Sequence, residues 1–321
     1  MRGVLTTLVG SFPLDATLEN FERALVDQVE VGIDIPVLPQ LRDFVEMYID
    51  PLLESGSVVK ERRGFVLKGS ISRYETKIPH EILYTADKAS EMGVEYRLAF
   101  TGPFTIASKI AVTVSRSGDF FNSILKERRL FEELLVYVED MADEIRRNVK
   151  PKIVCVDEPI LSVIVGSRKI LFDYSIEYIR EVLDRILSKF SGAEYRGVHI
   201  CSRLPPLLKE ILLNLENANF LDHEHHDVVA NRRYYTREEL LNNSKKLAYG
   251  IISSKKPEIE DYEEAMKLAQ DALQNYKETL IFLKPDCGFG GLKNYLQGKE
   301  YKEIVIPKLK ILTRVAQKLR D

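Results

Sequence analysis

The sequence predicts an α/β fold built as a single (β/α)8 TIM barrel, in which eight parallel strands alternate with helices. Three observations support this. Short aliphatic or β-branched runs recur along the chain with longer amphipathic segments between them. Eight such runs are present, and most are apolar throughout, as expected of strands buried on both faces. Polar residues of chemically reactive types stand where several of the runs end.

The eight expected strands cover residues 5–10, 33–38, 96–102, 152–158, 195–201, 219–225, 247–252 and 280–284. Two of the segments between them have the three-and-four spacing of one apolar helix face. The first face comprises Phe131, Leu134, Leu135, Val138, Met141, Ala142 and Ile145. The second comprises Ile259, Tyr262, Ala265, Met266, Ala269, Leu273 and Tyr276, with Pro257 near its start, where a missing N–H costs nothing.

The domain organisation expected is one catalytic barrel over residues 1–321 with an insertion at about 45–92. Within that insertion, residues 64–75 (GFVLKGSISRYE) read as a small β-hairpin laid over one end of the barrel. No stretch rich in Pro, Gly or Ser marks a linker, and no repeat is evident.

The same alternation of strands and helices also suits a doubly wound open sheet. The reactive residues favour the barrel. Ser11, Asp157, His199, Glu224 and Cys287 fall at or just past the ends of expected strands one, four, five, six and eight. In a closed barrel these ends surround one mouth, whereas an open sheet would separate the first strand from the last.

Composition excludes several function classes. Lys plus Arg number 46 against 49 for Asp plus Glu, so the chain lacks the basic excess of a nucleic-acid-binding surface. Three cysteines argue against a disulfide framework and for a reducing compartment. The apolar stretch at the N-terminus is too short for a signal peptide, and no run is long enough for a transmembrane helix. The expected location is the cytoplasm, with no membrane partner.

Four residues form a candidate metal site: His199 and Cys201 in GVHICS, Glu224 in FLDHEHHD and Cys287 in KPDCGFGG. Two thiolates, an imidazole and a carboxylate select zinc over magnesium or calcium, which prefer oxygen ligands. His199 and Cys201 are two residues apart, so on an extended segment both point to the same side.

Each of these residues alone has a structural explanation, since a buried Cys is usually packing and a buried His is usually hydrogen-bonded. Their joint placement at three strand ends favours zinc. A competing metal site is the cluster His223, His225 and His226, but on a strand Glu224 faces opposite to His223 and His225. Cys155 lies in mid-strand and is expected to be part of the core.

Zinc held by two thiolates activates water poorly, because thiolate donation offsets the charge of the metal. It suits binding a substrate thiol and lowering the pKa of that thiol from about 8.5. The expected reaction class is therefore S-alkylation. A closed structural zinc site is the alternative, although structural sites usually take their ligands from one or two short segments.

Several motifs in this order, TTLVGSFP, TGPFTI, VDEP, VHICS and KPDCGFGG, resemble the catalytic C-terminal half of cobalamin-independent methionine synthase. The resemblance implies a barrel of the superfamily that also holds uroporphyrinogen decarboxylase. It implies zinc on the four ligands named above and homocysteine as the thiol substrate. Val9 and Ser11 would bind the substrate carboxylate, and Asp157 would bind its amino group.

The sequence departs from the family pattern in four ways. It supplies one barrel where the complete family enzyme has two. Gln40 stands where the family has a glutamate that binds the substrate amine, which leaves more of that recognition to Asp157. Lys109 replaces a folate-stacking tryptophan, and the chain has no Trp. Lys255 aligns with the histidine that the family places after strand seven, and is the expected catalytic partner of Asp157.

The function expected is therefore zinc-dependent methyl transfer to homocysteine to form methionine. A methyl-corrinoid, free or on a carrier protein, is the expected donor in place of polyglutamyl folate. Two alternatives stay open: methylation of another small thiol, and a non-catalytic barrel subunit of a split methionine synthase that acts with a separate N-terminal-half-like barrel. A decarboxylase of the uroporphyrinogen type would need an arginine-rich mouth, and Arg203 alone does not supply one.

Overall fold

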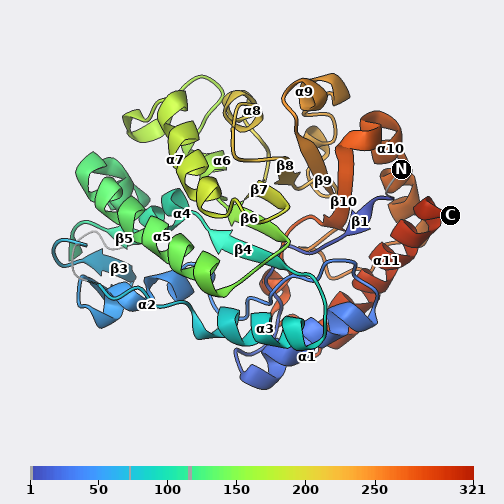
Figure 1. Cartoon of the computed structure of the whole chain (residues 1–321), viewed down its shortest axis with the longest axis horizontal. Helices are drawn as coiled ribbons and strands as arrows, with labels where there is room; N and C mark the ends of the chain where they lie inside the picture. The colour runs from blue at the N-terminus through green and yellow to red at the C-terminus, as the bar shows by residue number, and fades with distance from the viewer. Residues whose placement is uncertain (1–2, 72–73, 115–117) are drawn as a thin grey trace.

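The computed structural model describes residues 3–71, 74–114 and 118–321. At its centre is a parallel sheet of seven strands in the order β1-β10-β9-β8-β7-β6-β4 (Figure 1). The strands are β1 (Leu5–Thr6), β4 (Arg97–Thr101), β6 (Ile153–Asp157), β7 (Tyr195–Ile200), β8 (Phe220–His223), β9 (Lys246–Ile252) and β10 (Leu280–Pro285). Each lies within one of the expected strand segments or extends it by a single residue.

Residues 33–40 close the sheet into a barrel between β1 and β4. Parallel bridges join Thr7 to Ile35 and Val37 to Arg97. The segment has no regular ladder because Pro36 lacks an N–H, and the Val37 N–H donates to the side chain of Gln28 at 2.8 Å. The predicted (β/α)8 barrel is confirmed, with its second strand present only as isolated bridges.

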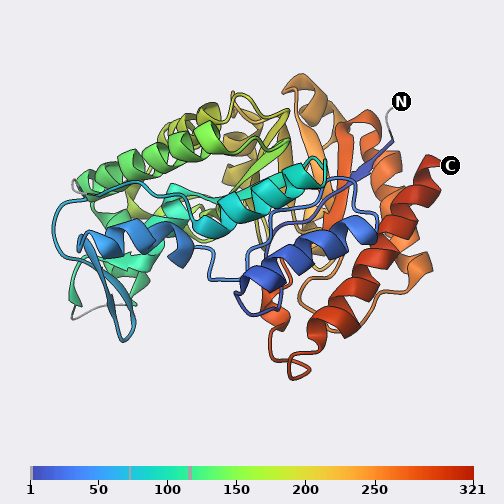
Figure 2. The same ribbon diagram turned by 60° about the horizontal axis from the view of Figure 1, so that its bottom comes forward.

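Helices surround the barrel in both views (Figures 1 and 2). They are α1 (Leu18–Glu30), α2 (Glu46–Glu54), α3 (His80–Glu91), α4 (Pro103–Lys109), α5 (Arg128–Asn148), α6 (Leu161–Ile164), α7 (Ile176–Lys189), α8 (Pro206–Leu213), α9 (Arg237–Asn242), α10 (Tyr262–Tyr276) and α11 (Ile306–Arg320). The whole apolar face predicted for α5 is buried. The face predicted for α10 is wrong at one end: Asp261 caps the helix, so Ile259 lies before it and is 47% exposed.

The insertion contains a β-hairpin, but in a different register from the one expected. Its strands are β2 (Val58–Glu61) and β3 (Gly64–Leu67), which pair antiparallel. The expected hairpin over residues 64–75 is therefore wrong, since its first four residues form the second strand; residues 72–73 lie outside the described part. β3 also pairs with β5 (Ile110–Ala111), so the hairpin is tied to the segment that follows α4 (Figure 1).

The barrel interior is filled at the end opposite the mouth. An apolar cluster there comprises Ile35, Ile153, Cys155, Phe220, Ala248 and Phe282, in agreement with the core role expected of Cys155. Gly197 makes room for it, because a Cβ at this position would lie 2.6 Å from the Phe220 ring. The candidate site residues at or past the ends of the strands lie at the other end. In the described part of the chain, no helix is both long and apolar enough to cross a membrane.

Candidate active site

The polar residues of the mouth stand at the C-terminal ends of β6, β7, β8 and β10, of which the first three are neighbours in the sheet. In the strand register Asp157 of β6 lies beside His199 of β7, and His199 lies beside Asp222 of β8. Side chains in register on neighbouring parallel strands point to the same side of the sheet. Cys201 and Cys287 follow within two residues of the ends of β7 and β10.

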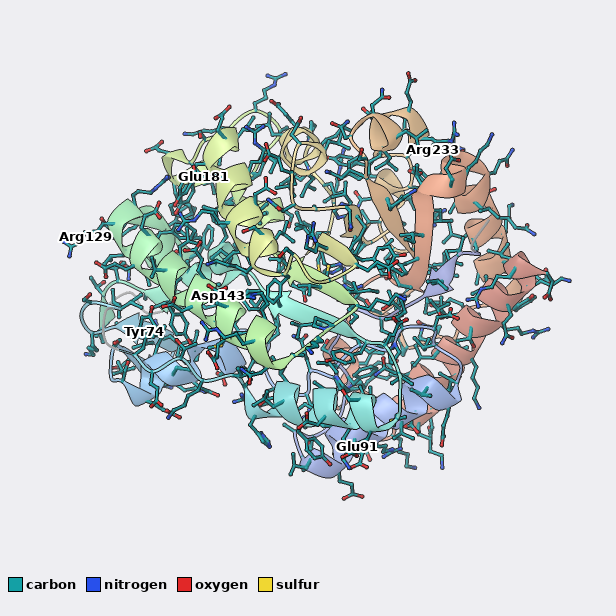
Figure 3. The ribbon with its side chains drawn as sticks, in the orientation of Figure 1. Tyr74, Glu91, Arg129, Asp143, Glu181 and Arg233 are labelled. Atoms are coloured by element: carbon teal, nitrogen blue, oxygen red, sulfur yellow. The ribbon has the colours of Figure 1, made fainter. Side chains whose placement is uncertain are left out.

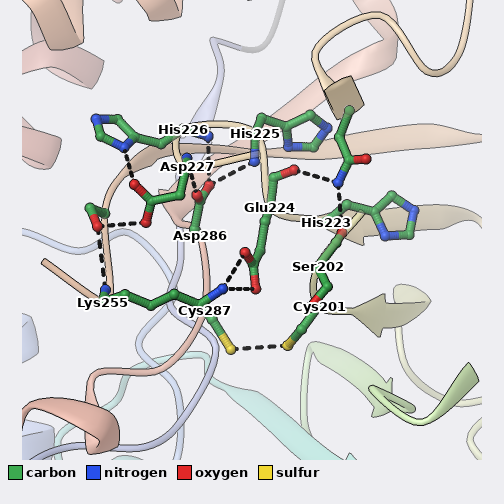
Figure 4. Close-up of polar contacts among 12 residues, drawn as sticks. Cys201, Ser202, His223, Glu224, His225, His226, Asp227, Lys255, Asp286 and Cys287 are labelled. Atoms are coloured by element: carbon green, nitrogen blue, oxygen red, sulfur yellow. Dashed lines mark hydrogen bonds and ion pairs between the residues drawn. The ribbon is translucent and has the colours of Figure 1, made fainter. Parts of the chain in front are cut away.

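Three of the four predicted metal ligands meet in one group. The ligand atoms of His199, Cys201 and Cys287 all lie within 4.8 Å of one another. His199 Nε2 is 3.1 Å from Cys201 Sγ. The two sulfur atoms, which Figure 4 shows side by side, are 3.2 Å apart. Residues 86 apart in sequence therefore place two thiols side by side, and nothing in either local sequence alone predicts this contact.

The other nitrogen of the His199 ring is held by a carboxylate. Nδ1 lies 2.7 Å from Oδ1 of Asp222, so Nε2 is directed at the sulfur atoms. Asp222 is fully buried between two buried cations, with Arg97 at 2.8 Å and Lys284 at 2.9 Å. Motif and strand-end position alone do not point to any of these three residues. A signal was present in two of them, because Arg97 and Lys284 are charged residues inside strands that are otherwise apolar.

These contacts set the charge of the imidazole. Burial alone would lower the pKa of His199, but the Asp222 carboxylate and the Cys287 sulfur outweigh it and raise that pKa to about 10. The pKa of Asp222 is well below its usual value, because Lys284, Arg97 and His199 together outweigh its burial. In the chain without metal, His199 is therefore an imidazolium at neutral pH.

The two cysteines share their proton unequally. The Cys201 thiol donates to Cys287, which holds the pKa of Cys287 well below the usual value for a thiol and raises that of Cys201. The imidazolium of His199 also lowers the pKa of Cys287. These contacts thus favour the thiolate of Cys287, which is the form that binds metals.

Glu224, the fourth predicted ligand, lies beside this group without being part of it. Its carboxylate is fully buried, and both of its oxygens accept hydrogen bonds from Lys255 Nζ, at 2.9 Å and 2.7 Å. Figure 4 shows this pair above the two sulfur atoms. Burial would lower the pKa of Lys255, but the contact with Glu224 outweighs it and raises the pKa.

Asn231 fixes the two loops that carry Cys201 and Glu224. Its Nδ2 donates to the carbonyl oxygens of Ser202 and Glu224, both at 2.9 Å. Ser202 has a φ of 72°, in the left-handed region that costs a residue with a side chain about 1 kcal/mol or more. The buried amide of Asn231 stabilises this turn just after Cys201. The sequence around Asn231 gives no indication of that role.

The competing histidine cluster does not converge. His223 Nε2 lies 3.1 Å from the hydroxyl of Tyr235, and the His225 ring stacks on Tyr249 with centroids 3.9 Å apart. His226 contacts Asp227 instead. Figure 4 shows the rings of His223 and His225 turned away from the sulfur atoms, as expected if the side chain between them, Glu224, faces the mouth.

A second group of metal-binding residue types, His226, Asp227 and Asp286, lies nearby. Asp286 already accepts the backbone N–H groups of residues 225, 226 and 227 at 2.7–2.9 Å. Asp227 accepts from the hydroxyl of Ser253 at 2.6 Å. Their oxygens are thus occupied in shaping the loop after β8.

Asp157 has an unused oxygen in the mouth. Its side chain is 6% exposed, and among the described residues its Oδ1 has no hydrogen-bond partner. Burial raises the pKa of Asp157 to about 7. The next residue, Glu158, differs in that it accepts from the N–H groups of Phe104 and Thr105 at 2.9 Å and 2.8 Å, at the start of α4. Of these two adjacent carboxylates, Asp157 is therefore the one with an oxygen free to bind a ligand.

The remaining predicted substrate residues lie where β1 and the second strand segment meet. The backbone of Ser11 pairs with that of Gln40 in an isolated parallel β-bridge. The Ser11 hydroxyl accepts a hydrogen bond from the N–H of Gly290 at 3.2 Å. Gly288 must be a glycine, since a Cβ there would lie 2.1 Å from Ser11 Oγ. Val9 is 5% exposed. The loop that carries Cys287 is thus packed directly on Ser11.

Gln40 and Lys109, two of the departures in sequence, have different surroundings. Gln40 is 5% exposed and donates to the carbonyl oxygen of Ala99 at 3.4 Å. Lys109 is the exposed last residue of α4. A neutral amide therefore lines the position at which the family pattern has a carboxylate.

Sequence comparison places the chain beside known methyltransferases. It is 28% identical to the methionine synthase of Methanocaldococcus jannaschii, with 94% of this chain and 100% of that protein covered. The resemblance to methionine synthase is confirmed. The chain is also 21% identical, over 98% of its length, to the 5-methyltetrahydropteroyltriglutamate–homocysteine methyltransferase of Thermotoga petrophila, of which it spans 44%. No family model matches the chain.

Solved structures with the same fold include a B12-independent methionine synthase from Shewanella sp. W3-18-1 in complex with selenomethionine. The TM-score is 0.69 at 19% identity, with 99% of this chain and 98% of that chain covered. A methyltransferase from Methanosarcina mazei gives a TM-score of 0.68 at 14% identity, with 100% and 95% covered. At these identities the likeness supports the barrel fold alone.

Proposed function

We propose that the chain catalyses zinc-dependent methyl transfer to the thiol of homocysteine, giving methionine. One observation carries the proposal: a group of one imidazole and two thiols stands in the barrel mouth close to a buried carboxylate, Asp157, with an unpartnered oxygen. A thiol-binding centre next to an ammonium-binding carboxylate suits an amino acid that bears a thiol. The similarity to methionine synthase supports the same substrate.

The residues present fit zinc. Sulfur atoms bound to one tetrahedral zinc at about 2.3 Å lie roughly 3.8 Å apart. The sulfur atoms of Cys201 and Cys287 are 3.2 Å apart, so a small outward movement of the two side chains would bring them to this separation. Asp222 holds the His199 ring with Nε2 toward the sulfur atoms, as carboxylates commonly do for zinc-binding histidines. When bound, zinc would lower the pKa of a substrate thiol so that it reacts as a thiolate.

Glu224 would be the fourth ligand, and Lys255 controls its availability. In the chain without metal, Lys255 neutralises the buried Glu224 carboxylate. Binding of Glu224 to zinc would exchange one cation for another, so neither state leaves a bare buried charge. Lys255 would act in catalysis by taking up Glu224 whenever a substrate thiol replaces that ligand.

Asp157 would hold the substrate amino group, and Ser11 with the backbone of Val9 would hold the carboxylate. These contacts fix the amino acid so that its sulfur faces the donor in line. The thiolate then forms a bond to the methyl carbon, while the bond from methyl to donor breaks and leaves its electron pair on the donor. The neutral Gln40 makes Asp157 the main partner of the ammonium.

The proposed donor is a methyl-corrinoid, free or carried by another protein. The exposed Lys109 offers no neutral flat face for a pterin, and ring stacking contributes about 0.5–1.5 kcal/mol. We expect methylcobalamin to support turnover at least tenfold better than methyltetrahydrofolate triglutamate, measured as methionine formed with zinc and homocysteine at equal donor concentrations.

The controls for this assay are chain without zinc and reactions without homocysteine. Faster turnover with the triglutamate would overturn the corrinoid part of the proposal. Turnover only after a separate N-terminal-half-like barrel is added would favour the split-enzyme alternative. Turnover with other thiols and none with homocysteine would favour a different small thiol.

The proposed location is the cytoplasm. Two partly exposed thiols 3.2 Å apart would oxidise to a disulfide in an oxidising compartment, and zinc could then no longer bind them.

Replacing Asp222 by Asn should weaken zinc binding about 10- to 100-fold, because the carboxylate no longer fixes the His199 ring. Chelator competition measures the affinity, and nitrogen NMR of the His199 ring in the zinc-free protein should show a lower pKa, because the carboxylate that raises it is gone. Asp227→Asn is the matched control, since Asp227 contacts Ser253 and His226 rather than the zinc group. Unchanged zinc affinity in a folded Asp222→Asn protein would rule out this positioning role.

A further inference from the structure

A cavity of about 420 Å³ opens beside the mouth, between the loops that follow β6, β7 and β8. Its lining includes Ser162 and Ser167 from the first loop, Arg203 and Pro205 from the second and Tyr234 from the third. Arg203 is two residues past Cys201 along the chain. A volume of this size lies within the range of small-molecule sites, and no part of the proposed function has so far used it.

The cavity walls are held in place by hydrogen bonds. Tyr234 donates its hydroxyl to the carbonyl oxygen of Pro205, which ties the third loop to the second. The N–H of Gly166 donates to the carbonyl oxygen of Lys169 at 2.9 Å, closing the turn of the first loop. Asn231 holds the carbonyl of Ser202 at 2.9 Å, directly before Arg203. The site is therefore formed before any ligand binds.

The cationic side chain in this cavity is that of Arg203. Arg203 is exposed, and it makes no ion pair or hydrogen bond with any residue in the described part of the chain. A second cavity, of about 400 Å³, differs in this respect. Its arginine, Arg42, is already bound to Glu81 at 2.6 Å and Asp50 at 2.8 Å. Arg203 is thus free to bind an anion from outside the chain.

The polar groups around Arg203 suit an oxyanion. A guanidinium binds phosphate or carboxylate through two parallel hydrogen bonds. The Ser162 hydroxyl already donates to the carbonyl oxygen of Pro159 at 2.8 Å, so the guanidinium of Arg203 is the donor that would bind the anion, beside the apolar side chains of Val165 and Leu204. None of the residues that line the cavity is acidic.

We propose that this cavity binds the anionic tail of the methyl donor, with Arg203 as the residue that recognises it. The tail is either the phosphodiester of a corrinoid nucleotide or the γ-glutamyl carboxylates of a reduced pterin. This inference rests on the proposed function for the identity of the ligand. The donor's reactive part then lies over the thiol group, because the cavity adjoins the loop that carries Cys201.

The test compares donors with and without the tail. Equilibrium binding at low ionic strength is measured for methylcobalamin against methylcobinamide, which lacks the phosphodiester and nucleotide, and for methyltetrahydrofolate triglutamate against the monoglutamate. Each is titrated into the wild-type chain and into Arg203→Gln. The matched control is Arg233→Gln, which removes another exposed arginine, from the loop before α9 and outside the cavity lining (Figure 3).

Arg203→Gln should weaken binding of a tail-bearing donor about tenfold, the loss expected for one charge-assisted hydrogen-bonded pair, and should leave methylcobinamide unchanged. A loss for methylcobalamin identifies the phosphodiester as the tail, and a loss for the triglutamate larger than for the monoglutamate identifies the glutamyl chain. Arg233→Gln should leave every donor unchanged.

Equal effects on donors with and without the tail would overturn the proposal, as would no effect on either or no binding of any donor to the wild-type chain. The measurement needs neither zinc nor homocysteine. A chain that binds a donor tail through Arg203 but does not methylate homocysteine would therefore retain this site and reject the proposed function. If Arg203→Gln instead methylates homocysteine as well as the wild type and binds every donor equally well, the proposed function is kept and the donor-tail site is rejected.

Discussion

Replacing Cys287 by Ser should remove zinc from the protein. We expect the wild-type chain to hold about one zinc and Cys287→Ser to bind it at least a hundredfold more weakly. The thiolate of Cys287 is stabilised before metal arrives, by the Cys201 thiol and by the imidazolium of His199. A serine hydroxyl stays protonated at neutral pH and cannot replace it. Zinc content after dialysis and chelator competition measure the effect.

Cys155→Ala is the matched control for this experiment. Cys155 is the third cysteine of the chain, and it lies in the apolar cluster at the other end of the barrel. Its removal should leave zinc binding unchanged. Stoichiometric zinc in a protein that lacks both Cys201 and Cys287 would refute the proposed metal site.

The same site predicts a change when homocysteine is added. X-ray absorption of the wild-type zinc protein should show two sulfur neighbours at about 2.3 Å, and a third once homocysteine is bound. A shell that stays the same at saturating homocysteine would indicate a structural zinc. This measurement separates metal binding from thiol activation.

The fold could be predicted because strands buried on both faces are apolar throughout, and this pattern is visible in the sequence. Seven of the expected runs form strands of the main sheet. The second run does not form a regular strand, because Pro36 cannot donate to a ladder and Gln28 takes the Val37 N–H. The sequence predicts the hairpin at the wrong residues, because its first strand, Val58–Glu61, precedes the segment with the clearest strand pattern.

The candidate site could be predicted in part, because reactive residues at strand ends of a barrel meet at one mouth. The grouping of His199, Cys201 and Cys287 follows from this rule. The salt bridge between Lys255 and Glu224 does not, since it depends on where the loop after β9 turns. Their roles in binding zinc and substrate stay predictions.

The carboxylate that holds the His199 ring, Asp222, could not be predicted for a different reason. Asp222 lies within FLDHEHHD, where five other residues are also of metal-binding types, so the sequence does not single it out. Its role depends on two cations from distant strands, Arg97 and Lys284, both of which are fully buried. The sequence shows each charge but not that the three meet.

Replacing Asp157 by Asn should weaken homocysteine binding by about 2–5 kcal/mol, or roughly thirtyfold to several thousandfold. The substrate ammonium would then lie buried against neutral groups, because Gln40 also carries no charge. Binding of 4-mercaptobutyrate, which has the same thiol and carboxylate without the amino group, should change little. Calorimetry on the zinc-loaded protein measures both affinities, and equal losses for the two thiols would rule out Asp157 as the amine partner.

The pH dependence gives a second test of Asp157. Burial raises the pKa of this carboxyl from its usual value to about 7, so below pH 7 the substrate-free protein holds it protonated. Only the carboxylate pairs with an ammonium, so the affinity for homocysteine should rise more steeply with pH around 7 in the wild type than in Asp157→Asn, where only release of the thiol proton contributes.

Folding stability should have the opposite sign of pH dependence. A carboxyl whose pKa is higher in the folded chain than in the unfolded chain favours folding at low pH, and this contribution is lost as the pH rises through the folded value of about 7. Asp157→Asn should therefore be more stable than the wild type above pH 7 without substrate, by thermal unfolding, and indistinguishable from it near pH 4. A variant that lost both stability and affinity at every pH would instead place Asp157 among the structural residues of the barrel, because an ammonium-binding carboxylate costs stability until its ligand arrives.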